Sequence, residues 1–129
     1  MSKKKGLRAV LFLFGLGTIL ILVVTLAPSG SSLPKNFWSH DKLGHAAMFF
    51  CWTFFDGLII LLNTRKFPNV LLLITRGLIF GGLIEVLQYL IPTNRSPEWL
   101  DLLADGIGSL IGIVFLYVLY KWRFQKSTA

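Results

Sequence analysis

Two stretches of this sequence place acidic, basic and imidazole side chains at the ends of strongly apolar segments. The first is Asp41-Lys42-Leu43-Gly44-His45, and the second runs from Glu85 to Asp105. Such side chains are costly in a hydrocarbon environment, so they mark candidate functional positions. A carboxylate beside an imidazole could act as a general base or orient one. A nearby cation could hold a phosphate or a carboxylate.

Helical spacing predicts that these groups converge. Three pairs of residues share a helix face because their members are three or four positions apart: Asp41 with His45, Glu85 with Gln88, and Asp101 with Asp105. Counted at 1.5 Å per residue from the nearest helix end, His45 and Asp105 would lie about 6 Å deep and Glu85 about 10 Å. We therefore expect one polar site near one face of a membrane.

The residue types suggest roles within this site. The catalytic candidates are His45, Glu85 and Asp105. The ligand-binding candidates are Asp41, Lys42, Gln88, Arg95 and Asp101. A divalent cation is a further candidate ligand, because His45 could bind it together with Glu85, Asp101 and Asp105. The alternatives are that a neighbouring carboxylate satisfies His45, and that Asp41 and Asp101 cap helix N-termini.

Two opposite charges lie nearer the other face. Asp56 comes seven residues before Asn63, and Arg76 comes seven residues after Asn69. Each is therefore about 10 Å from the same end of its helix. An Asp56–Arg76 ion pair is the least costly arrangement, and we expect it to fix helix register rather than to catalyse. The alternative is that Arg76 extends to the membrane surface.

The composition places the chain among membrane proteins. Of its 129 residues, 54% are hydrophobic and only 15% are charged, which is too little polar surface for a soluble domain. The net charge of +7 does not indicate nucleic-acid binding, because the basic residues gather at segment ends. The single cysteine, Cys51, excludes an intramolecular disulfide, and we expect it to be a buried, inert thiol.

The elements that must position the polar residues are four apolar spans. The first could instead be a secretory signal, but its uncharged run from Ala9 to Ala27 exceeds a usual signal core. Prolines and polar residues predict the connections between spans. We predict an all-α membrane protein with one four-helix domain over residues 1–129 and transmembrane helices at 7–27, 41–63, 69–91 and 101–121.

The distribution of basic residues predicts the orientation of these spans. Four lie near the N-terminus, two in the 64–68 turn and three near the C-terminus, whereas the opposite side has only Lys35, Lys42 and Arg95. The positive-inside rule therefore predicts that both termini are cytoplasmic. Gly77 with Gly81, and Gly108 with Gly112, are small residues four apart, which favours close packing of the helices behind the polar faces.

The polar residues in this order match a known pattern. Asp41-Lys42-x-x-His45, Glu85-x-x-Gln88, Arg95 and Asp101-x-x-x-Asp105-x-x-Gly108-x-x-x-Gly112 resemble the VanZ-like family, across residues 41–112. The resemblance implies a four-span protein of the bacterial plasma (inner) membrane and a link to resistance to the glycopeptide teicoplanin. It implies no agreed biochemical activity. The family often has Asn where this chain has Asp105, which points to a hydrogen-bonding role there.

Three functions are compatible with these observations. The first is binding of an anionic lipid or a lipid-linked cell-wall precursor, with Lys42 and Arg95 holding the anion. The second is an enzyme acting on such a headgroup, with Glu85 or His45 as acid–base group. The third is a scaffold that binds another membrane protein through its glycine faces. The expected partners are membrane lipids or a lipid-like ligand, and a homo-oligomer would be needed for transport.

Overall fold

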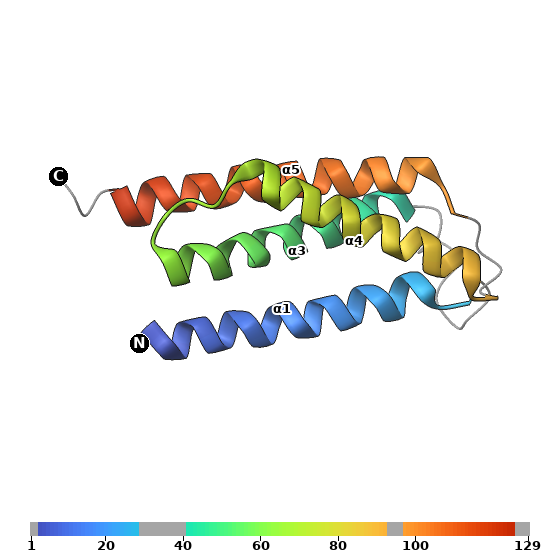
Figure 1. Cartoon of the computed structure of the whole chain (residues 1–129), viewed down its shortest axis with the longest axis horizontal. Coiled ribbons are helices and arrows are strands. Elements are labelled where there is room, and N and C mark those ends of the chain that lie inside the picture. The colour runs from blue at the N-terminus through green and yellow to red at the C-terminus, as the bar shows by residue number, and fades with distance from the viewer. Residues whose placement is uncertain (1–2, 29–40, 93–96, 126–129) are drawn as a thin grey trace.

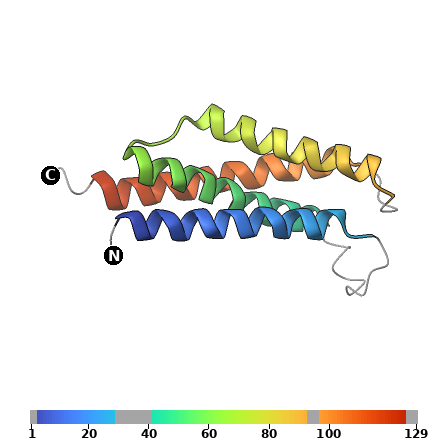
Figure 2. The same ribbon diagram turned by 60° about the horizontal axis from the view of Figure 1, so that its bottom comes forward.

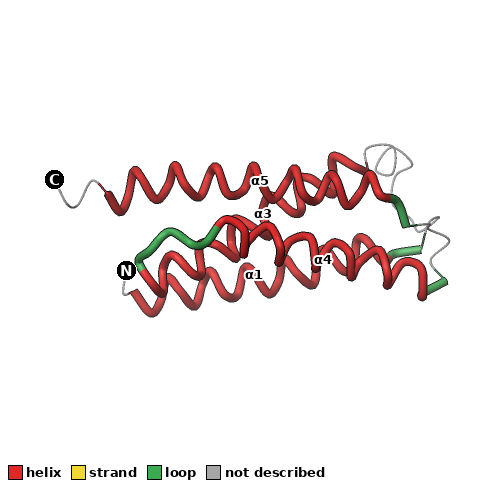
Figure 3. Tube along the Cα trace, turned by 45° about the horizontal axis from the view of Figure 1, so that its top comes forward, coloured by secondary structure: helices red, strands yellow, loops and turns green. Residues whose placement is uncertain are grey.

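Four long helices make up most of the described part of the chain, as the sequence predicts. The computed structural model describes residues 3–28, 41–92 and 97–125. The helices are α1 (Lys3–Leu26), α3 (Asp41–Thr64), α4 (Val70–Leu90) and α5 (Trp99–Tyr120), and a short π-helix, η1 (Lys121–Gln125), continues α5. All four are long and apolar enough to cross a membrane. Figure 3 shows no strand in the described part of the chain. The prediction of an all-α, four-span membrane protein is confirmed.

The helices run up and down in one elongated bundle. Both termini and the α3–α4 connection lie at one end, and α3 and α5 begin at the other (Figure 1). The longest interface joins α3 and α5, while α1 packs against α3 and α4. Figure 2 shows that α1, α3, α4 and α5 all run roughly along the long axis of the bundle. The starts of α3 and α5 therefore meet the ends of α1 and α4.

Local sequence determines where the helices begin and end. Asn69 caps α4, and its side-chain oxygen accepts a hydrogen bond from the Leu72 N–H at 3.1 Å. Arg65 ends α3 in a left-handed conformation with φ of 61°. The fourth helix begins at Trp99, two residues before the predicted start, and Glu98 is its N-cap residue. The capping alternative for Asp101 is therefore wrong, because this residue lies inside the first turn.

The paired glycines allow the close approach of helices. A Cβ placed at Gly108 would collide with the Ala46 carbonyl of α3, and one at Gly112 would lie 2.6 Å from the Phe50 carbonyl oxygen. On α4, a Cβ at Gly81 would lie 2.5 Å from Asp105 Oδ2, and Gly77 packs against Ser109 in the same way. In this fold, these glycine faces pack against the chain's own helices.

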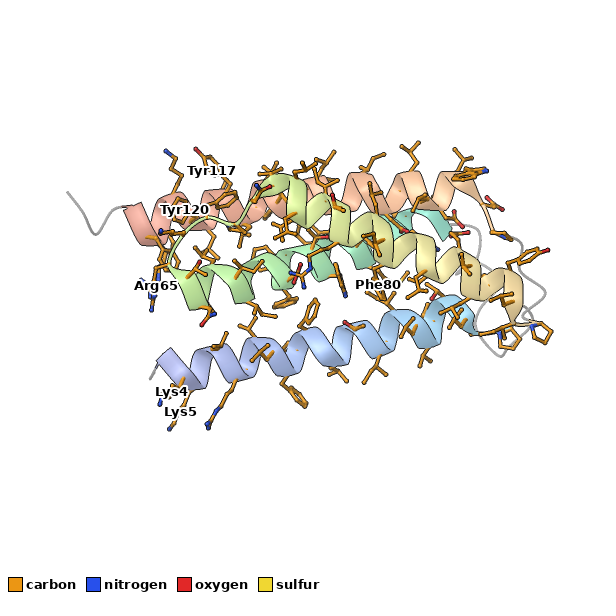
Figure 4. All side chains as sticks on the ribbon, viewed as in Figure 1. Lys4, Lys5, Arg65, Phe80, Tyr117 and Tyr120 are labelled. Atoms are coloured by element: carbon orange, nitrogen blue, oxygen red, sulfur yellow. The ribbon has the colours of Figure 1, made fainter. Side chains whose placement is uncertain are left out.

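Apolar side chains fill the bundle and also cover its outside. One buried cluster consists of Ile21, Phe49, Trp52 and Ile84, and a second of Leu61, Leu73, Ile113 and Leu116. Trp52 stacks on Phe80, labelled in Figure 4, with a centroid distance of 4.8 Å. The outer faces of the helices are also apolar, as a lipid environment requires. Cys51 is exposed on such a face, so the prediction of a buried thiol is wrong.

Candidate functional site

The centre of the polar site is a histidine paired with a carboxylate. His45 Nδ1 lies 2.8 Å from Asp105 Oδ1, and the two side chains are 1% and 0% exposed. Helix α3 carries the imidazole and α5 carries the carboxylate. Gly81 on α4 leaves the space that the Asp105 side chain fills. His45 Nε2 also lies 3.9 Å from Asp101 Oδ2, one turn nearer the helix start.

Lys42 forms the solvent-exposed edge of the same site. Its Nζ lies 2.9 Å from Glu98 Oε2 and 3.5 Å from Asp101 Oδ1. The lysine side chain is 48% exposed, whereas that of Asp101 is only 4% exposed. The accessible ammonium group of Lys42 therefore lies next to the buried carboxylate of Asp101, and the other oxygen of this carboxylate lies near His45.

Glu85 joins the site from α4 through the start of α5. Its Oε2 accepts a hydrogen bond from the Glu98 backbone N–H at 2.9 Å. Its Oε1 is buried and accepts no hydrogen bond from the described residues. Glu98 thus links two helices to Glu85, since its side chain pairs with Lys42 of α3 and its backbone lies at the N-cap of α5.

A cavity of about 250 Å³ opens beside Glu85, between α4 and the beginning of α5. Glu85 and Glu98 supply its charged side chains. The remaining wall is apolar or lacks a side chain: Gly82, Val86, Pro97, Trp99 and Leu102. An apolar pocket with a few polar groups at one side is the usual form of a small-molecule site.

Some of the predicted site residues lie elsewhere. Gln88 is buried, but it points to α1, where its Nε2 donates to the Thr25 carbonyl at 2.9 Å. It therefore ties two helices together and does not contact the acid–imidazole cluster among the contacts described. Arg95 lies outside the described residues, as does the side chain of Asp41, although the backbone of Asp41 begins α3.

The Asp56–Arg76 ion pair predicted from the sequence forms in the other half of the bundle. Arg76 Nη2 lies 3.1 Å from Asp56 Oδ1, with Asp56 almost fully buried and Arg76 43% exposed. Between this ion pair and the outer site, the Thr53 hydroxyl donates to Ser109 Oγ at 2.9 Å. Sequence reasoning gave neither Thr53 nor Glu98 a role. The sequence does contain a signal for each: Thr53 is a hydroxyl residue one helical turn from Asp56, and Glu98 is an acidic residue next to Pro97.

Within residues 3–28, 41–92 and 97–125, no group of three His, Cys, Asp or Glu side chains is arranged to hold a metal ion. The described geometry is instead that of a hydrogen-bonded and ion-paired network. His45 has a carboxylate at each ring nitrogen, at 2.8 and 3.9 Å. An imidazole with a carboxylate near each ring nitrogen is fixed in orientation.

Comparison with known proteins agrees with the fold and with the pattern of polar residues. No curated protein and no solved structure matches the chain. The VanZ/LLP1 family matches residues 6–120, which include all four helices except the first three residues of α1. The match also covers every residue of the polar site described above. The chain belongs to the VanZ/LLP1 family.

Proposed function

We propose that this chain is a multi-pass protein of the bacterial plasma membrane that binds the headgroup of an anionic lipid or a lipid-linked cell-wall precursor from the outer face. Both termini would be cytoplasmic. In support, Figure 4 shows Lys4, Lys5 and Arg65 at the end of the bundle that holds both termini. The acidic residues Glu85, Glu98 and Asp101 gather at the other end. This is the asymmetry expected from the positive-inside rule.

The observation that carries the proposal is the half-exposed Lys42, whose partner Glu98 also lines the cavity. Its ammonium group is the cation that the described site presents to the outside, and it is held in place by Glu98 and the buried Asp101. A phosphate arriving at headgroup level could replace the exposed Glu98 carboxylate, while Asp101 keeps the lysine oriented. Arg95 remains our candidate for a second cation, from outside the described residues.

Burial favours binding over catalysis. His45 and Asp105 are almost inaccessible, so a substrate could reach them only after the helices separate. A group that transfers a proton to a substrate must come within hydrogen-bonding distance of it. We therefore assign His45 and Asp105 to positioning Asp101 and keep Glu85, which lines the cavity, as the candidate for direct contact with a ligand.

The test is lipid binding by purified variants. Replacing Lys42 with Ala removes one charge-assisted interaction and should weaken binding of phosphatidylglycerol about tenfold. The matched control is Lys66→Ala, because this exposed lysine lies in the α3–α4 turn at the opposite end. Binding is measured by native mass spectrometry in detergent. If Lys42→Ala and Lys66→Ala bind phosphatidylglycerol with equal affinity, the proposal is wrong. It is also wrong if Lys42→Ala and Arg95→Glu both bind this lipid as tightly as the wild type does.

A link to teicoplanin resistance is part of this proposal, and it rests on the family resemblance. Bacteria that express the chain should tolerate more teicoplanin than bacteria carrying an empty vector. The Lys42→Glu variant should lose this gain, whereas Lys66→Glu should keep it. Equal protection by both variants would separate resistance from the polar site.

A further inference from the structure

We propose that the ligand of this site is an amphiphile whose headgroup contains both a phosphate and a primary ammonium group. The phosphate would bind Lys42, and the ammonium group would bind Glu85. This inference rests on the phosphate binding at Lys42 in the proposed function, and it adds to that headgroup an ammonium group that a purely anionic lipid lacks. The two ends of such a headgroup would contact Lys42 and Glu85, each of which is hydrogen-bonded to Glu98.

The charge of the site favours a ligand that carries a cation. Its described carboxylates outnumber its cations even when the imidazole is counted as protonated: Glu85, Glu98, Asp101 and Asp105 stand against Lys42 and His45. A purely anionic ligand would add to this excess of negative charge. An ammonium group on the same ligand would offset it.

The hydrogen bonding of Glu85 also favours an ammonium group. One carboxylate oxygen accepts the Glu98 N–H, and the other is buried and accepts nothing from the described residues. A buried acceptor without a donor is unfavourable, and most such atoms in proteins have a partner. An ammonium group has three donors and no acceptor. It matches a carboxylate oxygen in this position, whereas a phosphate oxygen does not.

The cavity beside the Glu85 carboxylate suits the apolar part of such a ligand. Apart from Glu85 and Glu98, its wall is formed by the apolar side chains Val86, Pro97, Trp99 and Leu102 and by Gly82. Such a wall suits the hydrocarbon part of an amphiphile. Lys42 Nζ and Glu85 Oε2 each lie 2.9 Å from atoms of the single residue Glu98. Lys42 therefore contacts the side chain of Glu98, and Glu85 contacts its backbone.

The experiment compares two lipids that differ only at the amine. Phosphatidylethanolamine and N-acetyl phosphatidylethanolamine with the same acyl chains are bound to the wild-type chain and to Glu85→Gln in detergent, again by native mass spectrometry. The wild type should prefer the free amine about tenfold. Glu85→Gln should lose this preference and bind the two lipids equally. The amide has the shape of the carboxylate and still accepts the Glu98 N–H.

The outcomes separate this inference from the proposed function. Equal binding of the two lipids by the wild type overturns the ammonium assignment, and it does so without relying on any variant. If Lys42→Ala still weakens both lipids, the proposed function survives that result. If the wild type binds neither lipid, both ideas fail. A lipid-linked precursor with a free amino group, tested with and without acetylation, shows which source of the ammonium is bound more tightly.

Discussion

A single methyl group at Gly112 should measurably loosen the bundle. A Cβ there would lie 2.6 Å from the Phe50 carbonyl oxygen and 3.3 Å from the Phe54 nitrogen, both in the backbone of α3. Ordinary contact begins at 3.4 Å, so α5 must move away by the difference, 0.8 Å. A gap of about 0.5–1 Å forfeits a quarter to a half of the dispersion attraction between facing atoms.

Overpacking of this kind costs about 1–3 kcal/mol, so we expect Gly112→Ala to lower the free energy of unfolding by about 2 kcal/mol. This corresponds to about a 30-fold change in the unfolding equilibrium constant. The measurement is a titration of the detergent-solubilised protein with sodium dodecyl sulfate, followed by tryptophan fluorescence and circular dichroism.

Gly106→Ala is the matched control on the same helix. A Cβ at Gly106 would meet only Leu78 Cδ2, at 3.6 Å, which is ordinary contact. Because alanine favours helix over glycine, this variant should be unchanged or more stable by up to about 1 kcal/mol. If Gly112→Ala unfolds at the same detergent concentration as Gly106→Ala, then close backbone approach does not hold α3 against α5.

Two further predictions concern the ion pair and the orientation. Replacing Arg76 with Met should destabilise the bundle by about 2 kcal/mol, below the range for fully buried pairs because Arg76 is half exposed. Changing Asp56 to Asn in the same chain should recover most of that loss, and a double variant as unstable as the single one would contradict the pairing argument. For the orientation, a fluorescent protein fused after residue 129 should fluoresce, and alkaline phosphatase fused there should be inactive; active phosphatase would reverse the proposed topology.

Periodicity and depth predicted much of the architecture. The spans were within a few residues of the helices, because long apolar runs bounded by proline and charge leave few alternatives. Counting residues from the helix ends placed His45 level with Asp105, and Asp56 level with Arg76, and the structure shows each pair in contact. Depth is a property of one helix, and it can be read from sequence.

The direction in which a side chain points around its helix could not be predicted as well. Glu85 and Gln88 are three residues apart, yet one faces the start of α5 and the other faces α1. Their directions depend on where neighbouring helices lie, and spacing alone does not contain that information. Glu98 was missed for a similar reason: its importance comes from contacts with two helices that are distant in the sequence.

Asp105 fills the volume that a side chain at Gly81 would need. Positions 81 and 105 therefore share one space, so a larger residue at position 105 requires a smaller residue at position 81. In an alignment of relatives, these columns should covary even though they lie on different helices. A mutation that removes the acid would also remove the selection that keeps its neighbour small, so the chemistry of the site and the spacing of the helices should change together during evolution.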